Sequence, residues 1–166
     1  MKSPYLVEHR LADVLCAIQV MGSHAWDSRK IEDWQENLGS KPQSANTWED
    51  VLADHPEFFG SRVWKENRLH FLRLRRSYER TVDPETFMEL PPEDIRQLKQ
   101  SGEFHNSRLS RKALLPTQVE ALMKTAIELQ VRAAVLADRR RWWIPIAAAA
   151  LGFGGAVVGS LFKSKP

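Results

Sequence analysis

A stretch of 21 residues without a charged side chain, from Trp142 to Phe162, constrains this chain more than any other feature. A helix of that length, at about 1.5 Å per residue, is long enough to cross the roughly 30 Å hydrocarbon core of a bilayer. Basic and aromatic residues border the stretch, as they do at membrane interfaces. The predicted interface residues are Arg139, Arg140, Arg141, Trp142, Trp143, Phe162 and Lys163. The pattern predicts one transmembrane helix over 142–162; the alternative is a buried helix rich in alanine and glycine.

The charges around this stretch predict its orientation. Charged residues interrupt the first 20 residues, so no secretory signal is expected there. The arginines before 142–162 outweigh the lysines after it, which places residues 1–141 in the cytoplasm. We therefore expect a single-pass membrane protein, anchored in a lipid bilayer near its carboxyl end, with 163–166 as a short tail. The single cysteine, Cys16, fits a reducing compartment.

Small residues recur within the uncharged stretch at helical spacing. Ala148, Gly152 and Ala156 are four apart, and Gly155 and Gly159 form a Gly-x-x-x-Gly pair. Small residues on one face let helix backbones approach closely in lipid. The spacing predicts association between copies of the chain, although a segment rich in alanine and glycine also contains such spacings by chance.

Residues 115–141 carry a heptad pattern. Its apolar positions are Leu115, Val119, Leu122, Ala126, Leu129, Ala133 and Leu136. The alternating spacing of four and three is typical of a coiled coil, and neither glycine nor proline interrupts it after Pro116. We predict a long amphipathic stalk helix that promotes a homo-oligomer. Because the apolar stripe widens to include Ile127 and Val135, the helix could instead pack on the chain's own domain.

Residues 1–80 predict three helices followed by a hairpin. The helices are expected over 5–21, from Asp27 or Ser28 to Gly39, and from a capping box of Thr47 and Asp50 to Pro56. Two extended runs, 58–65 and 68–76, meet at Glu66 and Asn67. This element order resembles the winged helix-turn-helix superfamily.

In the DNA-binding members of that superfamily, the third helix enters the major groove and the wing contacts phosphate. The resemblance implies the same roles for the third helix and the hairpin of this chain. The third helix predicted here carries Glu49, Asp50 and Asp54 and no basic residue. Phosphates would repel such a helix, because affinity for nucleic acid comes mainly from cations. Sequence-specific reading of DNA is therefore disfavoured.

The predicted wing has the opposite charge. Its basic strip consists of Arg62, Lys65, Arg68, Arg73, Arg75, Arg76 and Arg80. Such a strip, interleaved with Trp64, His70 and Phe71, could bind nucleic-acid phosphate or anionic lipid. The alternative is a solvated hairpin face whose charges prevent edge pairing.

Residues 81–114 are predicted to form a linker with one short helix, which begins near Pro92 and ends at Gly102. The five histidines are scattered, and the chain has no phosphate-binding glycine loop and no nucleophile elbow. No catalytic residue, metal site or cofactor is therefore expected.

These observations together predict a mainly α fold. It would comprise a small winged-helix-like α+β domain at the amino end, a long amphipathic stalk helix and a single carboxy-terminal transmembrane helix. We expect a non-enzymatic interaction or regulatory protein whose cytoplasmic domain binds an unidentified protein partner. The alternatives are a membrane-tethered nucleic-acid-binding regulator that uses the basic wing, and an oligomerising effector that perturbs the bilayer.

Overall fold

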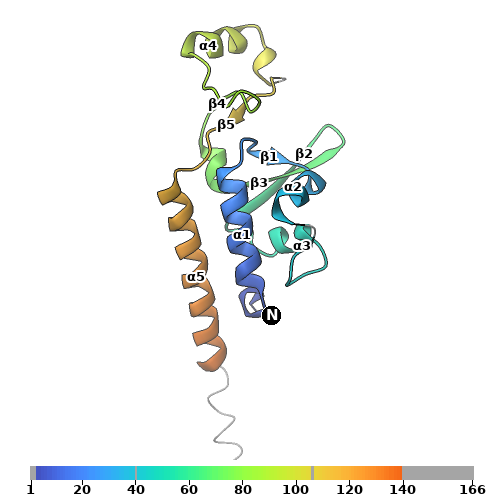
Figure 1. Ribbon diagram of the computed structural model, residues 1–166, viewed down its shortest axis with the longest axis vertical. Helices are drawn as coiled ribbons and strands as arrows, with labels where there is room; N and C mark the ends of the chain where they lie inside the picture. The colour runs from blue at the N-terminus through green and yellow to red at the C-terminus, as the bar shows by residue number, and fades with distance from the viewer. Residues whose placement is uncertain (1–2, 40, 106, 140–166) are drawn as a thin grey trace, which may run out of the picture.

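The computed structural model describes residues 3–39, 41–105 and 107–139 (Figure 1). The first part of the chain contains η1 (Pro4–Leu6), α1 (Arg10–Ser23), β1 (Ser28–Arg29), α2 (Ile31–Leu38), α3 (Trp48–Ala53), β2 (Phe59–Trp64) and β3 (Asn67–Leu72). The second part contains η2 (Arg73–Ser77), β4 (Arg80–Val82), α4 (Pro92–Gln100), η3 (Glu103–His105), β5 (Ser110–Arg111) and α5 (Pro116–Arg139). The order expected from the sequence, three helices and then a hairpin, is present, with β1 added between the first two helices.

Local signals account for α3. The Thr47 hydroxyl accepts a hydrogen bond from the Asp50 amide, and the Asp50 carboxylate accepts one from the Thr47 amide. This reciprocal cap confirms the predicted capping box, which satisfies amides that have no partner inside the helix. The apolar residues Trp48, Val51 and Leu52 then turn into the core.

Strands β1, β3 and β2 form an antiparallel sheet in that order. Successive side chains of a strand point to opposite faces, so the two faces of the sheet differ. The pair Phe59 and Leu72 is buried in the helical core. The other face carries Arg62 and Trp64, which are only partly covered by protein. We call this second face the open face of the sheet.

The core lies between the sheet and the helices. Trp34 of α2 is fully buried, and its indole Nε1 donates to the carbonyl of His70 in β3 at 3.0 Å. Val14, Ile18 and Met21 of α1 are also fully buried. The core therefore joins α1 and α2 to one face of the sheet.

Helix α5 runs beside α1 along much of its length (Figure 1). Val119 and Ala126 are buried in this contact, and a Cβ added at Gly22 would lie 3.0 Å from Val119 Cγ2. The Leu114 amide donates to the Gly22 carbonyl at 2.8 Å just before α5 begins. The predicted stalk helix therefore packs against the chain's own domain.

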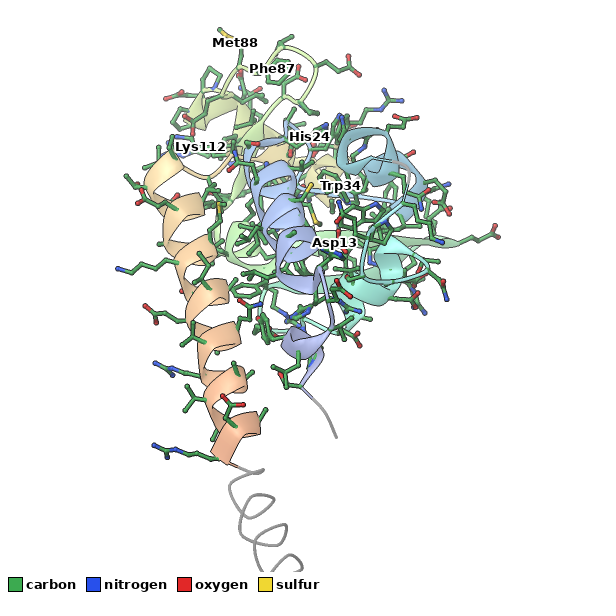
Figure 2. All side chains as sticks on the ribbon, turned by 60° about the horizontal axis from the view of Figure 1, so that its bottom comes forward. Asp13, His24, Trp34, Phe87, Met88 and Lys112 are labelled. Carbon is green, nitrogen blue, oxygen red and sulfur yellow. The ribbon has the colours of Figure 1, made fainter. Side chains whose placement is uncertain are left out.

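Residues 80–111 form a small unit of their own, where a linker was expected. Strands β4 and β5 pair antiparallel, and α4 and η3 lie between them in the chain. Figure 1 shows this unit at one end of the molecule, above the sheet. Its β4–α4 connection carries Phe87 and Met88, which are exposed at the edge of the molecule in Figure 2.

Arg75 joins this unit to the helical core. Its side chain is fully buried and donates six hydrogen bonds to main-chain carbonyls. Four of the carbonyls follow or end α1, and two belong to the segment around β5; they are those of Met21, His24, Ala25, Trp26, Arg111 and Lys112. A single cation therefore satisfies carbonyls from two segments that are far apart in the sequence.

The predicted single transmembrane helix is not supported, and the expected fold class was wrong on this point. Among residues 3–39, 41–105 and 107–139, no helix is both long enough and apolar enough to span a bilayer. The longest of them, α5, bears charged side chains on nearly every turn, including Glu120, Lys124, Glu128 and Arg132.

The uncharged stretch 142–162 lies outside the described residues. So do the predicted interface residues from Arg140 onward and the small residues Ala148, Gly152, Gly155, Ala156 and Gly159. Arg139, the remaining interface residue, is the last residue of α5.

Candidate anion-binding cleft

A cleft of about 900 Å³ lies between the open face of the sheet and the unit formed by residues 80–111. Seven basic residues line it: Arg29, Lys30, Arg62, Arg76, Arg80, Arg108 and Arg111. Among the described residues, only two carboxylates line it, those of Asp27 and Asp33. The cleft therefore concentrates positive charge in a chain whose net charge is only +3.

Strand geometry places Arg62 on the floor of the cleft. Arg62 pairs with Leu69 across β2 and β3, and both side chains lie on the open face. Its guanidinium Nη2 donates to the hydroxyl of Ser28 in β1 at 3.4 Å. Its Nε is buried and has no hydrogen-bond partner among the described residues.

Arg76 follows β3 and turns back over the same face. Its guanidinium carbon lies 4.9 Å from the centre of the Phe71 ring, a cation–π distance. The Phe71 ring lies over Gly60, where a Cβ would come within 2.7 Å of it. Because Gly60 has no side chain, the Phe71 ring can pack directly against its backbone, where the ring face contacts the Arg76 guanidinium. The Nη1 of Arg76 is buried without a hydrogen-bond partner within the described part of the chain.

Asp27 supplies the buried negative charge of the cleft. Its Oδ2 accepts a hydrogen bond from Arg111 Nη1 at 2.6 Å and lies 3.6 Å from Arg76 Nη1. The Asp27 amide donates to the Ser110 hydroxyl at 2.9 Å. Arg111 also donates from Nε to the Tyr78 carbonyl at 2.7 Å. One carboxylate is thus shared between two arginines and is held by β5.

The positive charges repel one another. Burial lowers the pKa of Arg76, and the nearby guanidinium groups of Arg111 and Arg62 lower it further. Burial lowers the pKa of Arg80 as well, again with contributions from Arg111 and Arg62. Asp27 opposes both shifts but does not cancel them. An anion in the cleft would relieve this repulsion.

Aromatic side chains flank the charged floor. Arg80 lies 4.8 Å from the centre of the Phe104 ring and donates to the Phe104 carbonyl at 2.8 Å. Trp26 and Trp64 also line the cleft. The site therefore combines hydrogen-bond donors with apolar walls, as binding sites for ligands and peptides do.

The structure divides the predicted basic strip. Arg62, Arg76 and Arg80 meet in the cleft, whereas Arg75 is buried in the core. Arg73 donates from Nε to the carbonyls of Pro56 and Phe59.

The remaining two members lie on the hairpin, outside the cleft. Arg68 pairs with Glu49 at 3.1 Å. Lys65 lies at the hairpin turn, with Nζ 4.8 Å from the Trp64 ring centre. The strip is therefore not a single binding surface, because its members point in different directions.

Sequence reasoning missed half of the cleft. Arg108 and Arg111 lie in a polar run within the predicted linker, and Arg29 and Lys30 lie at the start of the second predicted helix. No local sequence pattern identifies these four residues as part of a binding site, because only the folded chain brings them opposite β2.

Of the residues predicted to mediate self-association, the heptad positions within the described part of the chain lie mostly on the α1 side of α5. Val119 and Ala126 are buried, and Leu122, Leu129 and Ala133 pack against the chain's own core. The end positions Leu115 and Leu136 are 63% and 65% exposed. In the structure, α5 thus packs on the chain's own domain, which is the alternative that the sequence left open. Self-association stays a prediction.

A second cluster of titratable groups lies beneath η1. His55 is fully buried, its Nδ1 lies 3.1 Å from Glu57 Oε1, and Tyr5 also donates to that carboxylate. The His55 and Tyr5 rings meet edge to face at 4.5 Å. Burial lowers the pKa of His55 and raises that of Tyr5. Since protein covers the imidazole completely, this cluster contributes to packing and is not placed to contact a substrate.

The described residues contain no group of three or more histidine, cysteine, aspartate or glutamate side chains placed to hold a metal ion. Burial raises the pKa of the Cys16 thiol, which disfavours the nucleophilic thiolate.

Comparison with family models, with curated proteins and with solved structures finds no match to this chain.

Proposed function

We propose that this protein is a non-enzymatic interaction module that binds an anionic segment of a partner protein in the cleft. One observation carries the proposal: the cleft gathers seven basic residues against two carboxylates. Buried guanidinium nitrogens of Arg62 and Arg76 remain without hydrogen-bond partners in the described residues. Leaving such donors unsatisfied costs free energy that a bound anion would recover.

The groups that line the cleft support binding in preference to catalysis. Guanidinium groups remain charged near neutral pH and act as donors, not as general bases. The described residues that line the cleft include no histidine and no cysteine. Asp27, the buried carboxylate, is already shared between Arg76 and Arg111.

The shape and the charge of the domain favour a protein ligand over duplex DNA. The element order supports a winged-helix-like arrangement, in which α3 would face a DNA groove. Helix α3 carries Glu49, Asp50 and Asp54, and Glu49 neutralises Arg68 of the hairpin. The cations instead line a concave cleft of a size that suits a ligand or an extended peptide. A duplex presents its phosphates on a convex surface.

Fluorescence anisotropy of labelled ligands tests this proposal with the full chain. The ligands are a glutamate-rich peptide, a lysine-rich peptide of the same length, a single-stranded oligonucleotide and a short duplex. We expect the acidic peptide to bind and the lysine-rich peptide not to bind. Affinity should fall as salt rises, because the contacts are charged.

Two variants that each remove one positive charge locate the site. Arg62→Gln removes a donor from the floor of the cleft, and Arg132→Gln removes a cation from the exposed surface of α5. Arg62→Gln should weaken binding of the acidic peptide roughly tenfold, as expected for one charge-assisted hydrogen bond. Arg132→Gln should leave it unchanged. Equal effects of the two variants, or tighter binding of either nucleic acid than of the acidic peptide, would contradict the proposal.

A further inference from the structure

We propose that the anionic group recognised in the cleft is a phosphate monoester on a side chain of the partner protein, bound between Arg62 and Arg76. This inference rests on the proposed function and specifies the chemistry of its ligand. It depends on the direction in which the two guanidinium groups point, on the donors they leave free and on the charge around them.

The two guanidinium groups converge on one pair of residues. Ser28 of β1 is paired with Phe71 of β3, so their side chains lie next to each other on one face of the sheet. Arg62 contacts the Ser28 hydroxyl, and Arg76 lies over the Phe71 ring. Arg62 and Arg76 therefore contact neighbouring residues on the same face of the sheet. Each of them is held in place by a neighbour, which reduces the conformational entropy lost on binding.

The free donors match a tetrahedral anion. Arg62 Nε and Arg76 Nη1 lack hydrogen-bond partners among the described residues, and Arg76 Nη1 lies 3.6 Å from Asp27 Oδ2. Both nitrogens are buried, so an anion reaches them only when the two side chains shift toward the cleft. The Ser28 hydroxyl accepts from Arg62, which leaves its own proton to donate. A phosphate monoester presents three terminal oxygens, one for each of these three groups. A carboxylate presents only two oxygens, so one oxygen would have to accept from two of these three groups.

The local charge also favours a dianion. In the group of four guanidinium ions formed by Arg62, Arg76, Arg80 and Arg111, the positive charges of Arg62 and Arg111 lower the pKa of both Arg76 and Arg80. Asp27 contributes a single negative charge to this group. A phosphate monoester brings a charge of about −1.5 to −2 at neutral pH, whereas a glutamate brings −1. The phosphate therefore compensates the excess charge more completely.

The walls of the cleft suit a peptide as the carrier of the phosphate. Trp26, Trp64 and Leu69 line the cleft beside the arginines. Apolar walls of this kind contact the side chains that flank a phosphorylated residue, which free phosphate does not have. The ligand should therefore bind through both its phosphate and its neighbouring residues.

Anisotropy measurements with two labelled peptides of one sequence, one with phosphoserine and one with glutamate at the same position, test the inference on the full chain. We expect the phosphopeptide to bind at least about tenfold more tightly, because it gains one or more charge-assisted hydrogen bonds. Inorganic phosphate should displace the phosphopeptide, but only at concentrations far above the dissociation constant of the peptide. A single-stranded oligonucleotide of similar charge should bind more weakly than the phosphopeptide.

Variants at Arg62 separate the phosphate contact from general attraction. Arg62→Gln should abolish most of the preference for phosphoserine over glutamate. Arg62→Lys keeps the charge but loses the planar donor fork, so it should recover only part of that preference. Arg132→Gln, on the exposed surface of α5, should retain the full preference. Circular dichroism and thermal unfolding of each variant establish that it is folded.

The outcomes distinguish this inference from the proposed function. Equal affinities for the phosphoserine and glutamate peptides, both lowered by Arg62→Gln, would overturn the phosphate inference and support the interaction module. Failure of both peptides to bind would overturn both. Inorganic phosphate that binds as tightly as the phosphopeptide, or an oligonucleotide that binds more tightly, would overturn the assignment of the ligand to a partner protein.

Discussion

Replacement of Arg75 should destabilise the protein more than replacement of any other member of the predicted basic strip. The side chain is fully buried, and its six hydrogen bonds reach main-chain carbonyls on both sides of it. Burial lowers the pKa of Arg75 to about 10, so the guanidinium is charged at neutral pH. In Arg75→Ala, these carbonyls lose their donor and a cavity opens among them.

The size of the effect follows from the carbonyls. A buried polar group left without a partner costs about 1–3 kcal/mol. If water enters the cavity and satisfies half of the six carbonyls, the three that remain reduce the folding free energy by at least about 3 kcal/mol, at the lower end of that range. For a chain of this length, Tm should then fall by roughly 10 °C. Arg75→Lys keeps the charge but offers one nitrogen in place of three, so we expect an intermediate loss of about 2 kcal/mol.

Urea unfolding followed by circular dichroism measures these differences at pH 7. Arg132→Ala, which removes an exposed arginine from α5, provides the matched control and should change stability by less than about 0.5 kcal/mol. A loss below about 1 kcal/mol in Arg75→Ala would refute the reasoning, because the carbonyls would then not depend on the guanidinium.

Three further predictions follow from the core, from a buried histidine and from the cleft. Ala126→Glu places a charge in the contact between α5 and α1 and should cost more than about 3 kcal/mol, whereas Val131→Glu on the exposed side of α5 should be nearly neutral; urea unfolding compares them. Burial lowers the pKa of His55 below 6.5, so as the pH falls this histidine is protonated in the unfolded chain before it is protonated in the folded one. The free energy of unfolding should therefore decrease as the pH drops below about 6.5. His55→Gln should make this decrease smaller without removing it, because burial also lowers the pKa of His24 and His70. Gly60→Ala should displace the Phe71 ring, cost about 1 kcal/mol and weaken anion binding, while a Phe71→Leu background should relieve the loss of stability; an additive double-mutant cycle would argue against the contact.

The elements with local signals could be predicted from the sequence. Thr47 and Asp50 mark the start of α3 through the capping box, and the spacing of apolar residues marks α1. Residues 115–141 were expected to be helical for the same reason, and α5 covers Pro116–Arg139 of that range. The helix is a local structure, so nearby residues suffice to indicate it.

The partners of these elements could not be predicted in the same way. The heptad pattern shows that α5 has an apolar face but not what covers that face, and α1 covers it in the structure. Arg75 looks like a surface cation in sequence, because nothing near it signals six carbonyls contributed by distant segments. The transmembrane helix was inferred from composition, with no described helix to support it.

The cleft depended on still longer-range information. Arg62 could be assigned to a basic hairpin, but its neighbours Arg29 and Arg111 come from segments that are separated from it by more than 30 residues. The same distance explains why Asp27 was overlooked, since its partner Arg111 lies in a run that looked like a linker.

The late position of β5 and α5 in the chain affects how the protein can be made. Arg75 needs the carbonyls of Arg111 and Lys112, and α1 needs Val119 and Ala126 to cover its outer side. These residues are synthesised long after α1. During synthesis, the apolar face of α1 that α5 covers in the folded protein therefore stays exposed until α5 has left the ribosome. Folding from the amino end alone cannot finish the domain, and the nascent chain depends on contacts of large sequence separation, which form slowly.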